Sequence, residues 1–213
     1  MDYDRWYGKY QWIELEIEKN LKDFRIDSYR PNVRSIKRIG APFDTKKGWT
    51  ERKKIVMPTI HYNSLEQIQD DYKSKGISLG IFKPKRVYDL KIEKAPTDWS
   101  PKHEAVLRQQ VLGCFGKQPK PLEKIPYKFS YVFGCNDIRC KKTHTLTISD
   151  WEISQLYRNI KGKYPYAADV ILQKVKDKWL SNMWSPKRDS YLIVGTTFPN
   201  PGFIVLGVFW PPR

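Results

Sequence analysis

The chain has 213 residues and a formal net charge of +16, from 39 Lys and Arg against 23 Asp and Glu. Its 14% aromatic residues exclude a mostly disordered protein. No apolar run approaches the ~18 residues of a transmembrane helix. The first twenty residues are too polar for a secretory signal and too acidic for a transit peptide, so we predict a cytoplasmic protein of one large or two small domains.

The first half of the chain, residues 1–112, predicts a mixed α+β unit. Residues 11–19 (QWIELEIEK) alternate apolar residues with glutamates, which is the pattern of a half-buried strand. Residues 64–76 (SLEQIQDDYKSKG) predict a helix that Ser64 caps and Gly76 ends. The other elements expected here are a strand over 33–40, a helical turn over 48–58, two strands within 77–94 around Pro84, and a helix over 100–113.

Residues 113–126 (GCFGKQPKPLEKIP) predict a linker, because they hold three prolines and two glycines. Residues 127–213 then give strands and helices in the order ββααββ, which suits antiparallel strands covered by two helices. We therefore expect an α+β fold of two small units with mostly antiparallel sheets. The elements expected in the second unit are strands 127–135 and 144–149, helices 150–163 and 165–183, and strands 190–198 and 203–210.

Residues 134–152 (GCNDIRCKKTHTLTISDWE) contain a candidate metal site. Cys135 and Cys140 are separated by four residues, and His144 follows after three more. Thiolates and imidazole are zinc ligands, and three cysteines in a reducing compartment favour thiols or metal ligands over a disulfide. We predict that these three residues bind a metal, with zinc as the cofactor; the alternative is a plain hairpin with incidental thiols. The hairpin offers no obvious fourth ligand, and the candidates are Cys114, Asp137, His103 and His61.

The end of the same stretch allows two interpretations. Ser149 and Glu152 have the spacing of a capping box, and Asp150 in the first turn suits the helix dipole. Alternatively, His144, Asp150 and Glu152 form a Mg²⁺ or Mn²⁺ site of a metal-dependent nuclease, with His144 or Lys142 assisting water attack on phosphate. The sequence lacks an Asp/Glu-x-Lys pair, a phosphate loop, a nucleophile elbow and a His-Glu-x-x-His motif. It therefore favours binding over catalysis.

Aromatic and basic residues suggest what the protein binds. Alternate rings on the strand over 127–133 share one face, which either forms core or stacks single-stranded bases. The lysines and arginines fall in clusters with few carboxylates nearby, which predicts a surface that follows phosphates. The predicted nucleic-acid-binding residues are Lys46, Lys47, Arg52, Lys53, Lys54, Lys83, Lys85, Arg86, Arg139, Lys141, Lys142, Lys161, Lys163, Lys187 and Arg188.

The run with Cys-x4-Cys, His and Asp-Trp-Glu is the most distinctive part of the chain. Together with three other stretches, it resembles an uncharacterised family of microbial proteins. The resemblance covers most of the chain and implies no catalytic residue, since the family carries no established activity. Relatives often have one residue fewer between Cys140 and His144, and an extra N-terminal segment whose absence here would leave an open sheet edge for another chain. The stretches are FSYVFGCNDIRCKKTHTLTISDWEISQLYR, SLGIFKPKRV, KPLEKIPYKF and GFIVLGVFWPP.

These observations lead to one expected function and two alternatives. We expect a basic nucleic-acid-binding protein that is a non-enzymatic accessory subunit of a microbial nucleic-acid-handling or defence assembly. Its partners would be DNA or RNA and a larger protein assembly, with no membrane. The alternatives are the metal-dependent nuclease and a protein–protein adaptor that docks an acidic partner.

Overall fold

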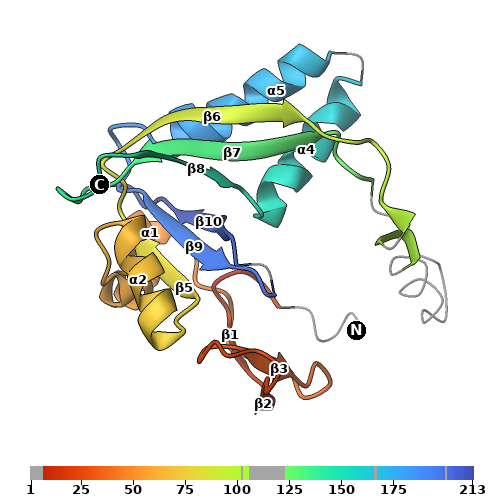
Figure 1. Cartoon of the computed structure of the whole chain (residues 1–213). Helices are drawn as coiled ribbons and strands as arrows, with labels where there is room; N and C mark the ends of the chain where they lie inside the picture. Colours follow the sequence, from red (N-terminus) through yellow and green to blue (C-terminus); the bar gives the residue numbers. More distant parts are fainter. Residues whose placement is uncertain (1–6, 102, 106–122, 166, 200) are drawn as a thin grey trace.

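The computed structural model describes residues 7–101, 103–105, 123–165, 167–199 and 201–213 (Figure 1). The protein has an α+β fold in two units with small antiparallel sheets, as the sequence predicts. Among its described helices, none is long and apolar enough to cross a membrane.

The first sheet has the order β6-β7-β8, so β7 is its central strand. Both pairings are antiparallel. Two helices, α4 and α5, lie along this sheet (Figure 1), and a π-helix, η3, continues α5. The bounds are β6 (Arg86–Lys94), β7 (Tyr127–Gly134), β8 (Thr143–Thr147), α4 (Trp151–Lys163), α5 (Ala168–Lys176) and η3 (Asp177–Asn182).

The second sheet has the order β10-β9-β5, again antiparallel, with α1 and α2 beside it (Figure 1). A parallel bridge between Ile148 and Val205 joins the two sheets. The bounds are α1 (Lys46–Val56), the 3₁₀ turn η2 (Met57–Thr59), α2 (Leu65–Lys75), β5 (Leu79–Phe82), β9 (Tyr191–Thr196) and β10 (Phe203–Phe209).

Both sheets join strands from the two sides of the predicted linker. β6 pairs with β7, and β5 pairs with β9, so backbone hydrogen bonds cross the division expected at residues 113–126. Most of that segment, and most of the helix predicted over 100–113, lie outside the described residues.

The strand predicted over 11–19 forms as two short strands, and the expected half-burial extends only to Leu15: Ile13 and Leu15 are partly buried between exposed residues, whereas Ile17 is exposed. β1 (Trp12–Glu14) pairs with β4 (Lys37–Ile39), and β2 (Ile17–Lys19) pairs with β3 (Tyr29–Pro31). Most of these residues are exposed. Alternation buries one face of a strand only where another layer covers that face. Here β2 and β3 form a narrow ribbon away from the larger sheets (Figure 1).

The alternating rings of β7 form the core. Phe129, Tyr131 and Phe133 are all 4% exposed or less, and Tyr127 packs on Tyr157 of α4 with ring centroids 5.6 Å apart. Tyr131 meets Trp184 edge to face at 5.7 Å. Burial on this scale excludes base stacking on this face, so the core interpretation is confirmed.

Helix α2 begins and ends as predicted, whereas α4 begins one residue later than the capping box requires. Ser64 Oγ accepts a hydrogen bond from the amide of Gln67, and Gly76 ends α2 with φ +71°. In α4 the N-cap is Asp150, whose carboxylate accepts from the amide of Glu152 at 2.8 Å. The Ser149 amide instead donates to the Val205 carbonyl, which holds Ser149 in the bridge between the sheets.

A buried hydrogen bond supports the π-helix η3. The Met183 amide donates to the Lys178 carbonyl, and the Trp184 amide donates to the Leu180 carbonyl, so the Trp179 carbonyl between these two acceptors receives neither amide. The hydroxyl of Tyr131 donates to this carbonyl at 2.5 Å. The central strand therefore supplies the bond at the place where the helix widens.

Replacing Tyr131 with Phe should lower the free energy of unfolding by about 1–3 kcal/mol, because it leaves the Trp179 carbonyl buried without this donor. Urea denaturation followed by circular dichroism measures the change. Tyr29→Phe, at a half-exposed ring on the β2–β3 ribbon, is the matched control and should change little. Equal losses in the two variants would contradict the assigned bond.

Candidate metal centre

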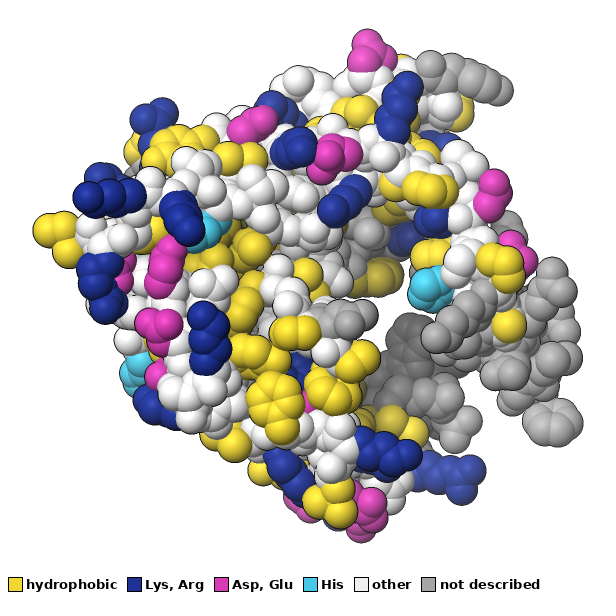
Figure 2. Space-filling view, in the orientation of Figure 1, with side chains coloured by type: hydrophobic (Ala, Val, Ile, Leu, Met, Phe, Trp, Pro, Cys, Tyr) yellow, Lys and Arg dark blue, Asp and Glu magenta, His cyan; other side chains and the backbone are white. Residues whose placement is uncertain are grey.

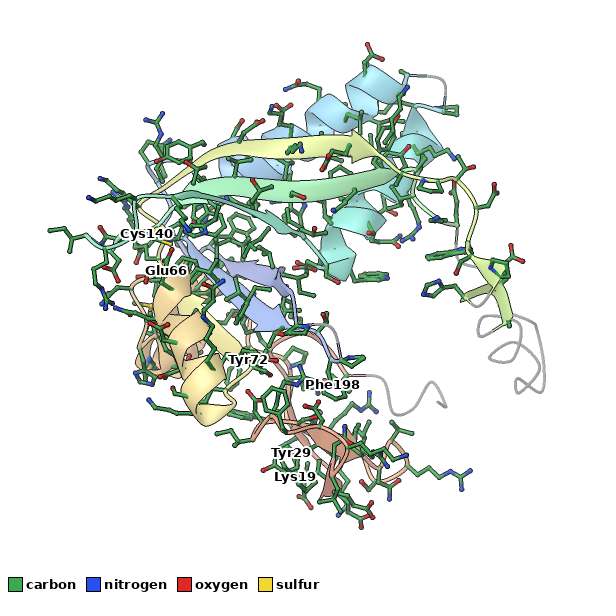
Figure 3. The ribbon with its side chains drawn as sticks, in the orientation of Figure 1. Lys19, Tyr29, Glu66, Tyr72, Cys140 and Phe198 are labelled. Atoms are coloured by element: carbon green, nitrogen blue, oxygen red, sulfur yellow. The ribbon has the colours of Figure 1, made fainter. Side chains whose placement is uncertain are left out.

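Four side chains from two parts of the chain meet at one end of the first sheet. Glu66, Cys135, Cys140 and His144 bring potential ligand atoms within 4.8 Å of one another. His144 Nε2 lies 2.9 Å from Glu66 Oε1 and 3.1 Å from Cys140 Sγ. Figure 3 shows Cys140 directly above Glu66, at the start of α2.

The β7–β8 turn docks on the N-terminus of α2. Cys135 follows β7 directly and is 5% exposed, and the Leu65 amide donates to its sulfur at 3.4 Å. Asp137 accepts from the Ser64 hydroxyl at 3.1 Å and from the Arg139 amide at 2.9 Å. The bonds to Arg139 hold the pKa of Asp137 at about 2, so this anchor is an anion at neutral pH.

The environment of the group opposes protons on the carboxylate and favours them on the buried thiol. Burial alone would raise the pKa of Glu66, but hydrogen bonds from Cys140 and the backbone lower it below its ordinary value. Burial, with a smaller contribution from the charge of Glu66, raises the pKa of the Cys135 thiol well above its ordinary value. A bound cation would instead lower the pKa of the Cys135 thiol, since a thiol that coordinates a metal ion is deprotonated.

The group fits a four-coordinate metal ion. Bond lengths of about 2.0–2.3 Å put the ligand atoms of a tetrahedral zinc roughly 3.3–3.8 Å apart. The separations here, up to 4.8 Å, require shifts on the order of 1 Å. Glu66 Oε2 is also buried with no hydrogen-bond partner among the described residues. The four residues could therefore hold a metal ion.

The three predicted ligands meet, and Glu66 is the fourth candidate that the sequence did not reveal. Of the residues considered for that place, Asp137 is bonded to Ser64 and Arg139. His61 and His103 are exposed and outside the group, and Cys114 lies outside the described residues. Nothing in the sequence around Glu66 distinguishes it from an ordinary acidic residue in the first turn of a helix.

The residues of the nuclease alternative separate into two places. His144 belongs to the four-residue group, whereas Glu152 pairs with Lys9 at 2.9 Å and Asp150 lies 3.8 Å from the same ammonium. In the described part of the chain, His144, Asp150 and Glu152 do not form a three-ligand group.

We call Glu66, Cys135, Cys140 and His144 the metal group. Some of the predicted basic residues line two adjoining hollows beside it. The first, of about 590 Å³, includes Lys85, Lys141 and Lys142 and is bounded by Cys135 and Cys140. The second hollow, of about 580 Å³, shares Lys85 and Tyr88 with the first. Dark blue side chains gather at this end of the molecule, on the left of Figure 2. The basic residues of the second hollow are Lys83, Lys85, Arg86, Arg188 and Arg213.

Several predicted basic residues, including Lys83 of the second hollow, have partners within the protein. Arg52 donates to the Phe43 carbonyl, and Lys53 donates to the Pro212 carbonyl. The remaining partnered residues form ion pairs with carboxylates. These pairs are Lys46–Asp44, Lys54–Glu51, Lys83–Asp189, Arg139–Asp137 and Lys161–Glu123.

The chain belongs to the family described as Domain of unknown function (DUF8757), whose profile matches residues 61–213. A second profile, Domain of unknown function (DUF8758), matches residues 1–58. The first profile contains all four residues of the metal group and both basic hollows. No curated protein and no solved structure matches the chain.

We expect about one transition-metal ion per purified chain, measured by elemental analysis. Cys135→Ser and Cys140→Ser should each remove the metal, because each takes away a thiolate ligand. Titration with Co²⁺ gives a second readout, since thiolate ligands produce a strong near-ultraviolet absorption band.

Glu66→Gln distinguishes a four-ligand site from a site of the hairpin alone. It should weaken metal affinity by at least ~10-fold, the loss seen even for groups that only support a ligand. Glu93→Gln, at a carboxylate of β6 paired with Lys91, is the control. Equal affinities in the two variants would remove Glu66 from the ligand set.

Proposed function

We propose that the protein binds nucleic acid through the two basic hollows, and that zinc holds the β7–β8 hairpin in place beside them. We propose that five cations contact the nucleic acid, and we call them the hairpin surface: Lys85, Arg86, Lys141, Lys142 and Arg188. The supporting observation is that these residues from separate segments line two hollows that share Lys85 and Tyr88.

The charges of the hairpin surface are available to a ligand. In the described part of the chain, none of its members forms an ion pair with a carboxylate. Lys85, Lys141 and Lys142 are exposed. Cations that displace counterions from a phosphate backbone supply the sequence-independent part of nucleic-acid affinity. This surface suits that role, and it indicates no base-specific contact.

The ligand set favours zinc and a structural role for it. Thiolate and imidazole suit zinc better than magnesium, which prefers oxygen ligands and retains water. Four protein ligands leave no open position for a substrate or a reactive water, as in structural rather than catalytic zinc sites. We therefore favour a binding protein, an accessory component of an assembly, over a nuclease.

The proposal predicts that binding depends on salt and on the hairpin lysines. The double variant Lys141→Gln/Lys142→Gln should weaken binding to a similar extent across sequences, and it should reduce the slope of log affinity against log salt by about 2. Fluorescence anisotropy with labelled single-stranded DNA, duplex DNA and RNA, from about 50 to 200 mM salt, measures both effects.

Lys161→Gln/Lys163→Gln is the matched control, because it removes the same charge at the end of α4. Elemental analysis of both double variants checks that the metal is retained. Wild-type affinity that does not change with salt, or equal losses in the two double variants, would contradict binding at the hairpin surface. Displacement by an acidic polypeptide but not by oligonucleotides would favour the adaptor alternative.

A further inference from the structure

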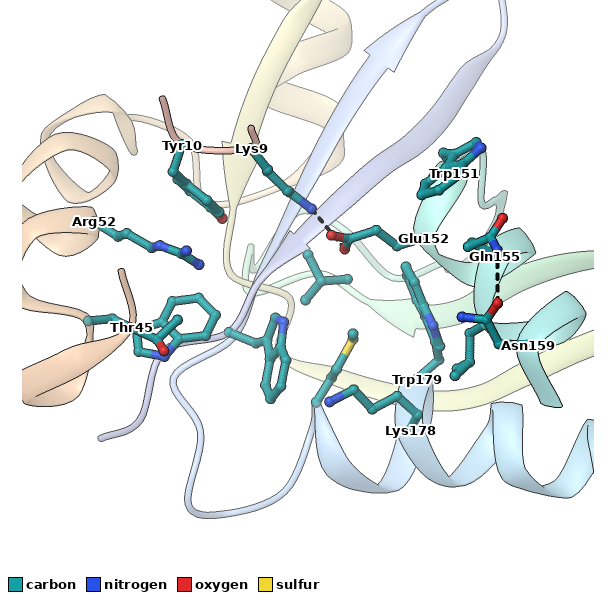
Figure 4. Close-up of a pocket in the computed structure, with 15 residues that line it drawn as sticks. Lys9, Tyr10, Thr45, Arg52, Trp151, Glu152, Gln155, Asn159, Lys178 and Trp179 are labelled. Atoms are coloured by element: carbon teal, nitrogen blue, oxygen red, sulfur yellow. Dashed lines mark hydrogen bonds and ion pairs between the residues drawn. The ribbon is translucent and has the colours of Figure 1, made fainter. Parts of the chain in front are cut away.

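A third cavity, of about 470 Å³, opens where the N-terminal segment and α1 face α4, η3 and the end of β10 (Figure 4). Its size is typical of pockets for small ligands. We call it the aromatic pocket, after the rings of Tyr10, Trp49, Trp151, Trp179 and Trp210 that line it.

Two cations in the aromatic pocket lie against these rings. The Arg52 guanidinium lies 4.1 Å from the centre of the Tyr10 ring and 5.1 Å from that of Trp49. The Lys178 ammonium lies 4.2 Å from the centre of the Trp210 ring. Neither cation forms an ion pair with a carboxylate within the described residues. The pocket therefore offers flat apolar surface and positive charge together.

The carboxylate in the pocket does not cancel this charge. Glu152 Oε2 pairs with Lys9 Nζ at 2.9 Å, as the dashed line in Figure 4 marks. Because Glu152 pairs with Lys9, the positive charges of Arg52 and Lys178 are not neutralised by it. At the other side of the pocket, the Gln155 amide donates to Asn159 at 2.9 Å, so the two amides retain donors and acceptors for the edge of a planar ligand.

Costly backbone conformations converge on the same walls. Tyr10 and Trp49 have φ of 63° and 65°, a region in which bulky residues are outliers. The π-helix η3 places Lys178 and Trp179 on the opposite wall, and π turns are frequent at functional sites. Strained conformations persist where the surrounding structure enforces them, and they cluster at ligand sites.

The aromatic pocket also adjoins the hairpin surface. Arg188, which lines the second basic hollow, lies 4.7 Å from the centre of the same Trp210 ring that Lys178 covers. A phosphate chain on the hairpin surface could therefore reach the pocket past Trp210.

We propose that the aromatic pocket binds a nucleotide, with its base stacked on the exposed ring of Trp151 or the partly buried ring of Trp210 and its phosphate held by Arg52 and Lys178. Stacking accepts every base, and guanidinium and ammonium groups are strong phosphate donors. The nucleotide can be free or the end of a nucleic-acid strand. This site stands on different residues from the hairpin surface and does not depend on the function proposed above.

Isothermal titration calorimetry of the full chain tests the site with AMP, CMP, GMP and UMP, and with adenosine and inorganic phosphate as partial ligands. 5′-Phosphorylated tetranucleotides form the second arm. We expect one nucleotide per chain, and binding about tenfold or more weaker for each partial ligand, because each lacks either the charge or the ring. Tighter binding of the tetranucleotides identifies a strand end as the source, and equal binding identifies the free nucleotide.

Lys178→Met and Arg52→Gln should each weaken nucleotide binding by about tenfold or more. Lys174→Met is the matched control, because Lys174 lies one turn away in the same helical run and covers a different ring, that of Tyr164, at 5.3 Å. It should bind like wild type. Thermal unfolding of each variant checks that the fold is retained.

Three outcomes would overturn the site: no binding in either arm, inorganic phosphate bound as tightly as a nucleotide, or equal affinities of Lys178→Met and Lys174→Met. The double variant Lys141→Gln/Lys142→Gln separates the two proposals. It should retain nucleotide binding in the pocket even if it loses binding of long nucleic acids at the hairpin surface.

Discussion

The register of β7 is the constraint on which the rest of the structure depends. β7 pairs with β6 on one side and β8 on the other, with Phe133 opposite both Val87 and His144. Side chains alternate along a strand, so a slip of one residue would turn the rings of Phe129, Tyr131 and Phe133 out of the core. The same slip would carry Cys135 away from the N-terminus of α2. The hydrophobic core and the metal group therefore require the same pairing.

β7 also connects the two proposed sites. Cys135, directly after its last residue, belongs to the metal group, and Tyr131 near its middle bonds the Trp179 carbonyl in η3. That π turn forms one wall of the aromatic pocket. One well-packed strand thus positions a residue of the metal group at its end and a wall of the aromatic pocket near its middle. Side chains held by regular elements in this way keep their positions more precisely than side chains on loops alone.

Local sequence patterns predicted the elements well, but they could not predict contacts between distant segments. Ser64 and Gly76 mark the ends of α2 because caps act within a few residues. The spacing of Cys135, Cys140 and His144 in one hairpin likewise indicated three ligands that meet. Glu66 comes from a helix in the other half of the chain, so only the docking of the hairpin on α2 brings it near. The half-burial expected over 11–19 stops after Leu15 for a related reason, because the covering layer that it assumes is a tertiary feature.

The aromatic pocket could not be found from the sequence for the same reason. Its walls come from five separate segments, and the positive φ angles of Tyr10 and Trp49 belong to residues for which sequence favours the opposite sign. The alternating rings of β7 were a more visible candidate for stacking bases, yet they are core. The pocket tryptophans that keep exposed area are instead Trp151 and Trp210, from separate segments of the chain.

The crowding of two cations at Trp210 has a consequence for how the protein balances stability against binding. Lys178 and Arg188 lie over the same ring, and the pKa of Lys178 is lowered by burial and then by the charge of Arg188. The folded chain therefore keeps two like charges in a place where each makes the other less favourable. A neutral residue of similar size at either position would relieve this repulsion and make the fold more robust. Natural proteins tolerate such locally unfavourable groups where a function requires them. An anion placed between Lys178 and Arg188 would offset their repulsion, so the anion binding proposed for this region would also stabilise the fold.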